Sequence, residues 1–220
     1  MASKLADNFA LATYNTPIPN KNPGVPSQSK WFQPDVQGAV FSRLLQKNSK
    51  GPFLELGTWT GAGSTKFVAQ NFKQMDIICV DTWEGSPEHH KIAAYNKVRV
   101  RLWDHFCSNL WDYRDRIYPL KMTTIAGMHA VLNSGIKPEV IYVDAAHDTD
   151  SVYEDVSTAL SLFPEAKLCG DDYAPKQNPG VSDAIERCIR ERLFPRHMFK
   201  THKRCWYLEN PAIQSELERL

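Results

Sequence analysis

Phe53-Leu-Glu-Leu-Gly-Thr-Trp-Thr-Gly-Ala-Gly-Ser-Thr65 combines a short apolar segment, a glycine-rich turn and the start of a helix. Gly57, Gly61 and Gly63 follow the spacing G-x-x-x-G-x-G, which differs from the dinucleotide pattern and from the phosphate loop. Glycine has no Cβ, so such a turn lets a small molecule approach the backbone, and the following helix start offers unpaired N–H groups. This stretch therefore predicts a strand that ends in a small-molecule site.

The segments on either side alternate between strand-like and helix-like patterns. A helix over 64–72 and an apolar strand over 77–80 follow the opening strand, and a strand–helix–strand unit of this kind implies parallel strands. The alternation predicts an α/β doubly wound, seven-stranded, mostly parallel sheet with helices on both faces and an antiparallel strand at the C-terminus. Further strands are expected at 117–120, 140–143, 167–169, 198–201 and 205–208, and further helices at 36–45, 124–134, 151–162 and 181–193.

Length and composition narrow the class of protein. We expect one domain over residues 31–220, because 220 residues suffice for a substantial single core. With 26 basic and 25 acidic side chains, the chain has no overall field that favours nucleic acid or an anionic membrane. No segment resembles a signal peptide or is apolar enough to cross a bilayer, and five scattered cysteines indicate neither a disulfide framework nor a zinc site. A cytoplasmic protein is expected.

Two segments lack a clear pattern. Residues 1–30 hold four prolines among polar residues, which predicts a flexible arm or a lid that orders over a ligand. The connection 82–116 is longer than usual and rich in tryptophan and histidine, with His89, His90 and His105 as possible substrate contacts. We interpret it as an insertion on the acceptor side of the site, or as a satellite core.

Two acidic residues flank the turn. Asp81 ends the second strand, where a carboxylate can accept hydrogen bonds from both hydroxyls of a ribose; the alternative is that it caps a loop. Glu55 lies within an apolar strand, where an ionised carboxylate needs a partner. That partner is either a ligand ammonium group or an Arg or Lys side chain. Asp81 combined with the glycine turn indicates a ligand that contains a nucleoside.

Four segments resemble a known family when they are taken together. They are Glu55–Ser64, Val80-Asp-Thr-Trp83, Tyr142-Val-Asp-Ala-Ala-His147 and Gly170-Asp-Asp-Tyr173 followed by Gly180-Val. In order and spacing they resemble class I S-adenosylmethionine-dependent methyltransferases with a Rossmann-like sheet. The group that they resemble most is that of small-molecule O-methyltransferases related to the macrocin-type sugar methyltransferases.

The resemblance implies a role for each matching position. Glu55 and Gly57 would lie beside the methionine part of the cofactor, and Gly61, Gly63 and Ser64 would shape the turn under it. Thr58 and Asp144 would be further contacts of the cofactor. Asp81 would hold the ribose. Thr82 and Trp83 would border the adenine. Thr123 and Thr124 would make a further contact on the adenine side, unless they are only helix N-caps.

Asp144, Asp171 and Asp172 follow two strands that would be neighbours in such a sheet. Carboxylates that converge without basic partners repel one another unless a cation neutralises them, which predicts a site for Mg²⁺ or another divalent cation. In metal-dependent O-methyltransferases such a trio holds the acceptor hydroxyl through the ion. Adjacent strand residues point to opposite faces, so the three can share an ion only if the strand breaks at Gly170. The alternative is that Asp144 acts alone and Asp172 caps a loop.

The expected reaction is methyl transfer to a hydroxyl group of a small molecule, with Asp144 or His147 accepting its proton. Arg99, Arg101, Arg114 and Arg116 leave open a methyltransferase that acts on RNA or protein. A non-catalytic nucleoside-binding protein on the same fold is a further alternative, and a dehydrogenase is disfavoured by the glycine spacing. The chain could also form a homo-oligomer.

Overall fold

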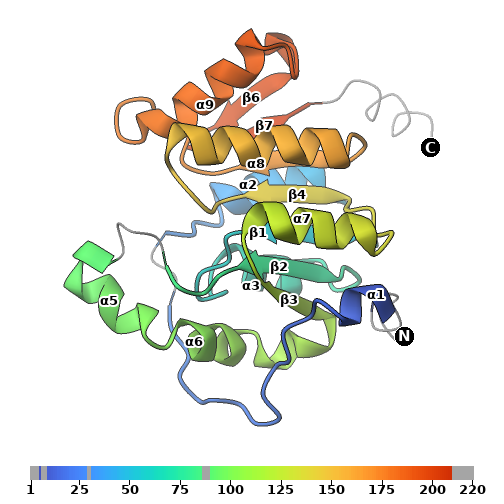
Figure 1. Ribbon diagram of the computed structural model, residues 1–220, viewed down its shortest axis with the longest axis vertical. Coiled ribbons are helices and arrows are strands. Elements are labelled where there is room, and N and C mark those ends of the chain that lie inside the picture. Colours follow the sequence, from blue (N-terminus) through green and yellow to red (C-terminus); the bar gives the residue numbers. More distant parts are fainter. Residues whose placement is uncertain (1–4, 6–8, 29–30, 86–89, 210–220) are drawn as a thin grey trace.

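The computed structural model describes residues 5, 9–28, 31–85 and 90–209. Seven strands form one sheet in the order β3-β2-β1-β4-β5-β7-β6, and helices lie on both of its faces (Figure 1). Five strands are parallel, and β7 runs antiparallel to both of its neighbours. The strands are β1 Phe53–Leu56, β2 Ile77–Asp81, β3 Ile117–Lys121, β4 Val140–Val143, β5 Lys167–Gly170, β6 Phe199–His202 and β7 Cys205–Leu208. The predicted fold class is therefore confirmed, with β6 displaced by one residue.

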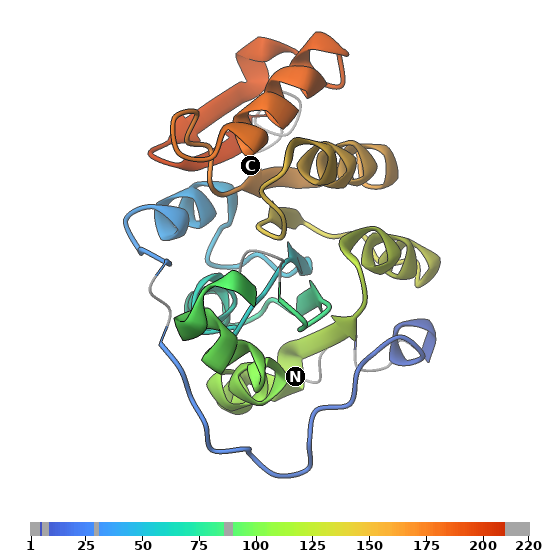
Figure 2. The same ribbon diagram turned by 60° about the vertical axis from the view of Figure 1, so that its left-hand side comes forward.

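The helices separate into two layers, as Figure 2 shows from the side. The first layer consists of α7 Thr124–Asn133, α8 Thr149–Leu162 and α9 Pro179–Arg190. The second consists of α2 Gln37–Leu44, α3 Ser64–Asn71 and α6 Leu102–Asn109. Successive strand residues alternate between the two cores, so that Leu54 and Ile141 face the first layer while Phe53 and Tyr142 face the second. Burial on both faces explains why these strands are apolar throughout.

The connection between β2 and β3 is largely helical in its described part. It contains α5 Ala93–Arg99, α6 and a 3₁₀ helix at Trp111–Arg116. Leu102 and Phe106 of α6 are buried against the sheet, so α6 is the crossover helix that a pair of parallel strands requires. The interpretation of the whole connection as an irregular insertion was therefore wrong for residues 102–116. His89 lies outside the described residues.

The described part of the N-terminal arm lies along the edge of the sheet and along α6. A short helix, α1 Phe9–Ala12, interrupts the irregular structure that the prolines predicted. Thr16 N–H donates to the carbonyl of Pro119 at 2.6 Å, and Thr16 Oγ1 accepts from the N–H of Lys121 on edge strand β3. Further along, the N–H of Val25 donates to Ser108 Oγ at 3.0 Å. These bonds cover an otherwise open sheet edge, and a lid function stays a prediction.

None of the helices in the described ranges is long and apolar enough to cross a membrane.

Candidate functional site

A cavity of about 1050 Å³ lies at the carboxyl ends of the parallel strands. Ligands of open α/β sheets bind at this edge, and the volume is sufficient for a nucleoside-sized ligand together with a second small molecule. Residues after β1, β2, β3, β4 and β5 line it, and Trp31, Phe32, Tyr95 and Arg204 enclose it from other elements. The cavity therefore collects residues that are far apart in the sequence.

The glycine turn is fixed first of all by contacts between backbone segments. Gly57 has φ +86°, and a Cβ at this position would lie 2.3 Å from the carbonyl oxygen of Asp144. Gly61 has φ +66°, and its Cβ would lie 2.8 Å from Leu110 Cδ1. Only glycine allows both the dihedral angle and the close approach. Gly57, Thr58, Gly63 and Ser64 line the cavity, whereas Gly61 packs against α6 and is not among the lining residues.

Asp81 closes the turn with its carboxylate. Oδ2 accepts from the N–H groups of Thr58 at 2.9 Å and Trp59 at 2.8 Å, and Oδ1 accepts from the N–H of Trp83 at 2.7 Å. Burial raises the pKa of Asp81, while these backbone N–H groups act in the opposite direction. Asp81 therefore does cap the loop, as the alternative interpretation held. It also lines the cavity, so ribose binding remains a prediction.

Thr82 and Trp83 differ in their position. Thr82 lines the cavity, but the Trp83 side chain is only 5 % exposed and is not among the lining residues. Trp83 packs against Trp103 and Phe106 with ring centroids 4.7 and 4.8 Å apart, and its Nε1 donates to the carbonyl of Trp59. This packing favours the satellite aromatic core for Trp83, and its expected place beside the adenine stays a prediction.

Glu55 is fully buried and has neither of the partners expected from the sequence among the described residues. Its carboxylate accepts hydrogen bonds from the hydroxyls of Ser64 and Thr65, the latter at 2.6 Å. Burial raises the pKa of Glu55 to about 7, although the two hydroxyl hydrogen bonds lower it. Ser64 lines the cavity and Glu55 does not. Glu55 is therefore connected to the cavity through Ser64.

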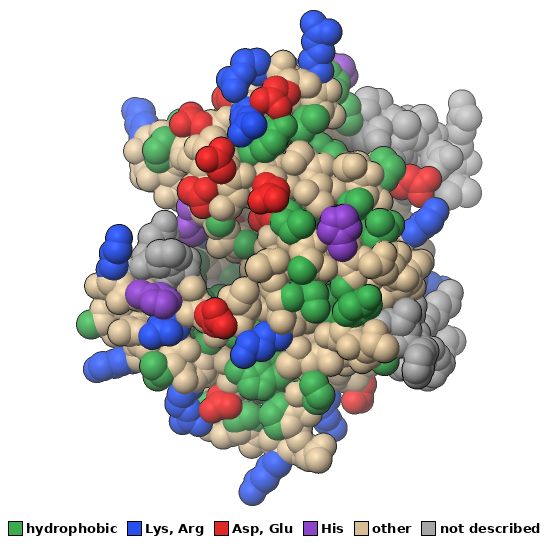
Figure 3. Space-filling view, in the orientation of Figure 1, with side chains coloured by type: hydrophobic (Ala, Val, Ile, Leu, Met, Phe, Trp, Pro, Cys, Tyr) green, Lys and Arg blue, Asp and Glu red, His purple; other side chains and the backbone are tan. Residues whose placement is uncertain are grey.

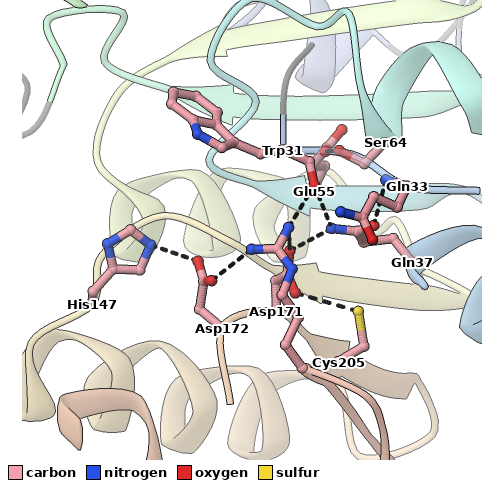
Figure 4. Close-up of polar contacts among 10 residues, drawn as sticks. Trp31, Gln33, Gln37, Glu55, Ser64, His147, Asp171, Asp172 and Cys205 are labelled. Carbon is pink, nitrogen blue, oxygen red and sulfur yellow. Dashed lines mark hydrogen bonds and ion pairs between the residues drawn. The ribbon is translucent and has the colours of Figure 1, made fainter. Parts of the chain in front are cut away.

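The loop that carries Asp171 and Asp172 contacts a positively charged side chain that the sequence did not reveal (Figure 4). Arg204, in the turn between β6 and β7, lies 2.9 Å from Asp171 Oδ2 through Nη2, and its Nη1 donates to Asp172 Oδ1 at 2.8 Å. The argument that three carboxylates converge without a basic partner was therefore wrong. Asp171 also accepts from Gln37 Nε2 at 2.7 Å and from the thiol of Cys205 at 3.4 Å. These partners hold Asp171 in a structural network.

A different trio offers ligand atoms to a cation. One atom each of Asp144, His147 and Asp172 lie within 4.8 Å of one another, and His147 Nε2 is 3.0 Å from Asp172 Oδ2. Asp172 has φ +59°, so the chain has already left β5 and turns the Asp172 side chain away from that of Asp171. This is the strand break that a shared cation site requires. The residues that come together there are Asp144, His147 and Asp172, and Asp171 is not one of them.

The charge state of the trio follows from its surroundings. Burial raises the pKa of Asp144 well above its usual range, and the charges of Asp171 and Asp172 raise it further. Among the described residues the Asp144 carboxylate has no hydrogen bond or ion pair. Burial alone would also raise the pKa of Asp172, but His147 and Arg204 outweigh it and hold that pKa below its usual value. The trio therefore combines the ionised carboxylate of Asp172 with the Asp144 carboxylate, which has no hydrogen bond or ion pair within the described residues.

The start of α7 brings a second missed residue to the cavity. Thr123 is the N-cap of α7 and accepts from the N–H of Ala126, as the alternative interpretation predicted. Thr124 Oγ1 donates at 2.5 Å to Asp155 Oδ1. Thr123, Thr124 and Asp155 all line the cavity. Asp155 is only 3 % exposed and lies on α8. No motif marks it, because it is one acidic residue among several in an amphipathic helix.

Three aromatic rings lie at the other side of the cavity. Trp31 is 5.9 Å from Trp59 and 5.3 Å from Tyr95 between ring centroids. The carbonyl oxygen of Trp31 accepts from Arg204 Nη2 at 2.6 Å and from Gln37 Nε2 at 3.2 Å. The segment that follows the arm is thus tied directly to the acidic network.

The remaining sequence candidates do not enter the cavity. His105 bonds through Nδ1 to the carbonyl of Val25, and His90 bonds to the carbonyl of Glu84. Neither histidine is among the lining residues. The expectation of substrate contact therefore finds no support for these two.

Two buried hydroxyl groups test whether the cavity suits a polar ligand. Thr58 Oγ1 and Tyr142 Oη have no hydrogen-bond partner among the described residues, and both residues line the cavity. Buried polar atoms without partners are rare in folded proteins and are commonly satisfied by a ligand or water. Together with Asp81 and Ser64 they provide the hydrogen-bonding groups that a nucleoside with an amino-acid tail requires. The donor set therefore fits S-adenosylmethionine.

Comparison with known proteins identifies the family. A family model described as a methyltransferase domain matches residues 54–173, which is more than half of the chain. The chain therefore belongs to this family of methyltransferase domains. No curated protein matches it in sequence.

Solved structures agree with this assignment at the level of the fold. Similar structures include CalS11, a calicheamicin methyltransferase (14 % identity, 80 % of this chain and 77 % of that chain, TM-score 0.53), and the O-methyltransferase NovP (15 %, 80 % and 76 %, 0.51). A fibrillarin pre-rRNA processing protein from Methanococcus jannaschii is also similar (12 %, 88 % and 85 %, 0.52). At such low identity the likeness concerns the fold alone.

Proposed function

We propose that this protein transfers the methyl group of S-adenosylmethionine to a hydroxyl oxygen of a small molecule, with a divalent cation bound beside the acceptor. The observation that carries the proposal is the joining of two kinds of site in one cavity. The glycine turn and Asp81 form one part, and Asp144, His147 and Asp172 form the other. A donor and an acceptor held in this way react in an effectively unimolecular step.

The methyl donor would lie along the turn. Ser64, backed by Glu55, would accept a hydrogen bond from its ammonium group. Asp81 would accept from the ribose through the lone pairs that its three backbone contacts leave free, since a carboxylate has about four acceptor positions. S-adenosylmethionine supplies a methyl group that is already activated by a sulfonium sulfur.

The acceptor hydroxyl must lose a proton as the new bond forms. His147 and the Asp144 carboxylate are the groups beside the acceptor position that can take it. Asp172 bonds to His147 Nε2 at 3.0 Å, which orients the ring and stabilises its protonated form. Arg204 in turn holds Asp172 ionised and in place.

A divalent cation would be held by Asp144, Asp172 and His147. Two carboxylate oxygens and one imidazole nitrogen suit a borderline or hard cation. The cation would replace the present contact between His147 and Asp172, so proton acceptance by that pair belongs to the cation-free site and is the alternative to activation by the cation. Its chemistry at this position would be to lower the pKa of the acceptor hydroxyl. The trio with Asp171, expected from the sequence, would require Asp171 to leave Arg204.

Methylation of RNA has less support from the described residues. Arg116 donates to the carbonyls of Ala69, Phe72 and Met75, and Arg101 pairs with Asp104. Arg99 contacts Asn96 and the carbonyl of Glu84, and Arg114 lies over the ring of Trp111. Each of the four arginines thus already has contacts within the chain, and in Figure 3 acidic and basic side chains are interspersed on the visible face.

The direct test is transfer of labelled methyl groups to a panel of small hydroxyl compounds, with purified protein before and after chelation. We expect transfer to at least one acceptor, loss of transfer on chelation and recovery on addition of Mg²⁺. Transfer that survives exhaustive chelation would remove the cation from the proposal. Transfer to RNA or protein, but to no small hydroxyl compound, would favour a macromolecular acceptor. Binding of the donor without any transfer would favour a nucleoside-binding protein.

A further inference from the structure

The start of α7 and the buried side chain of Asp155 form a polar edge that the proposed reaction does not use. Asp155 comes from α8, is 3 % exposed and lines the same cavity as Asp81. One of its carboxylate oxygens accepts from Thr124 at 2.5 Å. The other has no hydrogen-bond partner among the described residues. A buried carboxylate with a free oxygen at a cavity wall calls for a hydrogen-bond donor.

We propose that Asp155 accepts a hydrogen bond from the exocyclic amino group of the adenine in the methyl donor. This rests on the proposed function, because it presumes that S-adenosylmethionine occupies the cavity. It adds a residue that hydrogen-bonds to the base. The sequence motifs indicate the turn, the ribose contact and the adenine-side positions Thr82, Trp83, Thr123 and Thr124, but not Asp155.

The topology places the base on this side of the cavity. Asp81 ends β2, and β3 is the neighbour of β2 at the edge of the sheet, so the residues after β3 lie beside the expected ribose position. The segment after β3 contributes Met122, Thr123, Thr124 and Ile125 to the lining. Met122 and Ile125 are partly buried apolar side chains against which the flat face of a base can pack. The edge of that base would then face Thr124 and Asp155.

The polarity of this edge matches adenine and not its deaminated form. The N–H groups of Thr124 and Ile125 belong to the first turn of α7, where backbone donors have no partner within the helix. Adenine presents an acceptor, N1, beside a donor, the 6-amino group. A backbone N–H next to a carboxylate is complementary to that pair. Hypoxanthine presents the reverse, a donor at N1 and a carbonyl oxygen at position 6, which a carboxylate repels.

A purely structural role is the competing explanation. The bond between Thr124 and Asp155 joins α7 to α8, and it could exist only to hold the two helices together. In that case Asp155→Asn would change the melting temperature without changing which base the cavity prefers. The two explanations therefore differ in a measurement of base preference, which does not depend on catalytic activity.

The experiment is calorimetric titration of the full chain with S-adenosylhomocysteine and with S-inosylhomocysteine, which differ only at the base edge. The wild type is expected to bind the adenine compound at least about tenfold more tightly, since an unsatisfied buried group costs more than 1 kcal/mol. In Asp155→Asn, whose amide can both donate and accept, the preference should fall to within about threefold. The matched control is Asp183→Asn on α9, an exposed carboxylate that is not among the residues lining the cavity, which should retain the wild-type preference.

Each outcome has one meaning. Equal base preference in wild type and a folded Asp155→Asn variant overturns the role of Asp155 but leaves the methyl donor in place. Failure of the wild type to bind either compound counts against the proposed function itself, and Asp155 then has no base to read. If Asp155→Asn does not fold, Asp155→Ser supplies the second variant, because it removes the carboxylate and keeps a hydroxyl that can accept from Thr124. A folded Asp155→Ser with unchanged preference would then overturn the proposal.

Discussion

Replacing Glu55 by Gln should stabilise the unliganded protein at alkaline pH. Glu55 is fully buried in β1, and within the described part of the chain its charge is offset only by the hydroxyls of Ser64 and Thr65. Its burial raises the pKa to about 7 from an ordinary value of 4.5, and the charge of Asp81 raises it further. Glutamine has nearly the same shape and carries no charge to bury. Its Oε1 can accept from one of the two hydroxyls, and its Nε2 can donate to the oxygen of the other.

The magnitude follows from the two pKa values. Because the folded pKa is raised, the folded state prefers the protonated carboxyl. The stability of the wild type is therefore highest below about pH 4.5 and falls as the pH rises towards 7. Above pH 7 the full cost is 2.5 pKa units, or about 3 kcal/mol. At pH 8 Glu55→Gln should thus melt about 6–12 °C higher than the wild type, and at pH 5 the gain should shrink to below about 1 kcal/mol.

Thermal unfolding at pH 5 and pH 8 without ligand measures this effect. The matched control is Glu165→Gln, since the Glu165 side chain is 82 % exposed and pairs only with Lys137 among the described residues. The control should melt within about 1 °C of the wild type at both pH values, because exposed ion pairs contribute little. An equal gain for Glu55→Gln at both pH values, or a loss at pH 8, would refute the reasoning that Glu55 is a buried charge without a cation. The same variant should bind S-adenosylhomocysteine more weakly, because the ligand ammonium loses a nearby negative charge.

Three further changes test separate parts of the account. Gly57→Ala should cost at least about 3 kcal/mol of unfolding free energy, because the added Cβ would meet the Asp144 carbonyl. The control Gly135→Ala, with φ +69° and open space around it, should cost only about 1–2 kcal/mol. Equal costs for the two variants would show that no close approach exists at Gly57. Tyr142→Phe removes a buried hydroxyl without a partner and should raise the melting temperature by a few degrees, as measured by calorimetry; a clear decrease would mean that the hydroxyl is satisfied. Asp172→Asn should lower kcat by about 10²–10⁴ while S-adenosylhomocysteine affinity stays within about threefold; a kcat near that of the wild type would exclude the pair with His147 from proton transfer.

The fold was predictable because parallel strands and their helices leave strong local patterns. Leu54 and Phe53 are both apolar because both faces of β1 are covered, and the crossover helices repeat at 3.6 residues. The exception is α6, whose pattern was obscured by the tryptophans and histidines within it and on either side of it. Phe106 of α6 is buried because the helix packs on the sheet, and the periodicity of the helix sequence alone does not predict that packing.

The site was predictable only where its residues follow strand ends. Asp81, Asp144 and Asp172 end strands or follow them directly, so the topology alone brings them to one edge. Arg204 and Asp155 were missed because a hairpin turn and the middle of a helix reach the cavity through tertiary packing. The partner of Asp171 was therefore misjudged, since Arg204 is 33 residues further along the chain. For Trp83 the related difficulty is that backbone position does not determine where a side chain points.

The measurement that tests the central claim most directly is equilibrium titration of the wild-type chain with S-adenosylhomocysteine, with NADH as the comparison ligand. The account predicts one saturable site for S-adenosylhomocysteine per chain and none for NADH, because the turn offers hydrogen bonds to a ribose and an ammonium group and its glycine spacing is not that of a dinucleotide site. A folded protein that shows no binding of S-adenosylhomocysteine, or that binds NADH in its place, would contradict it.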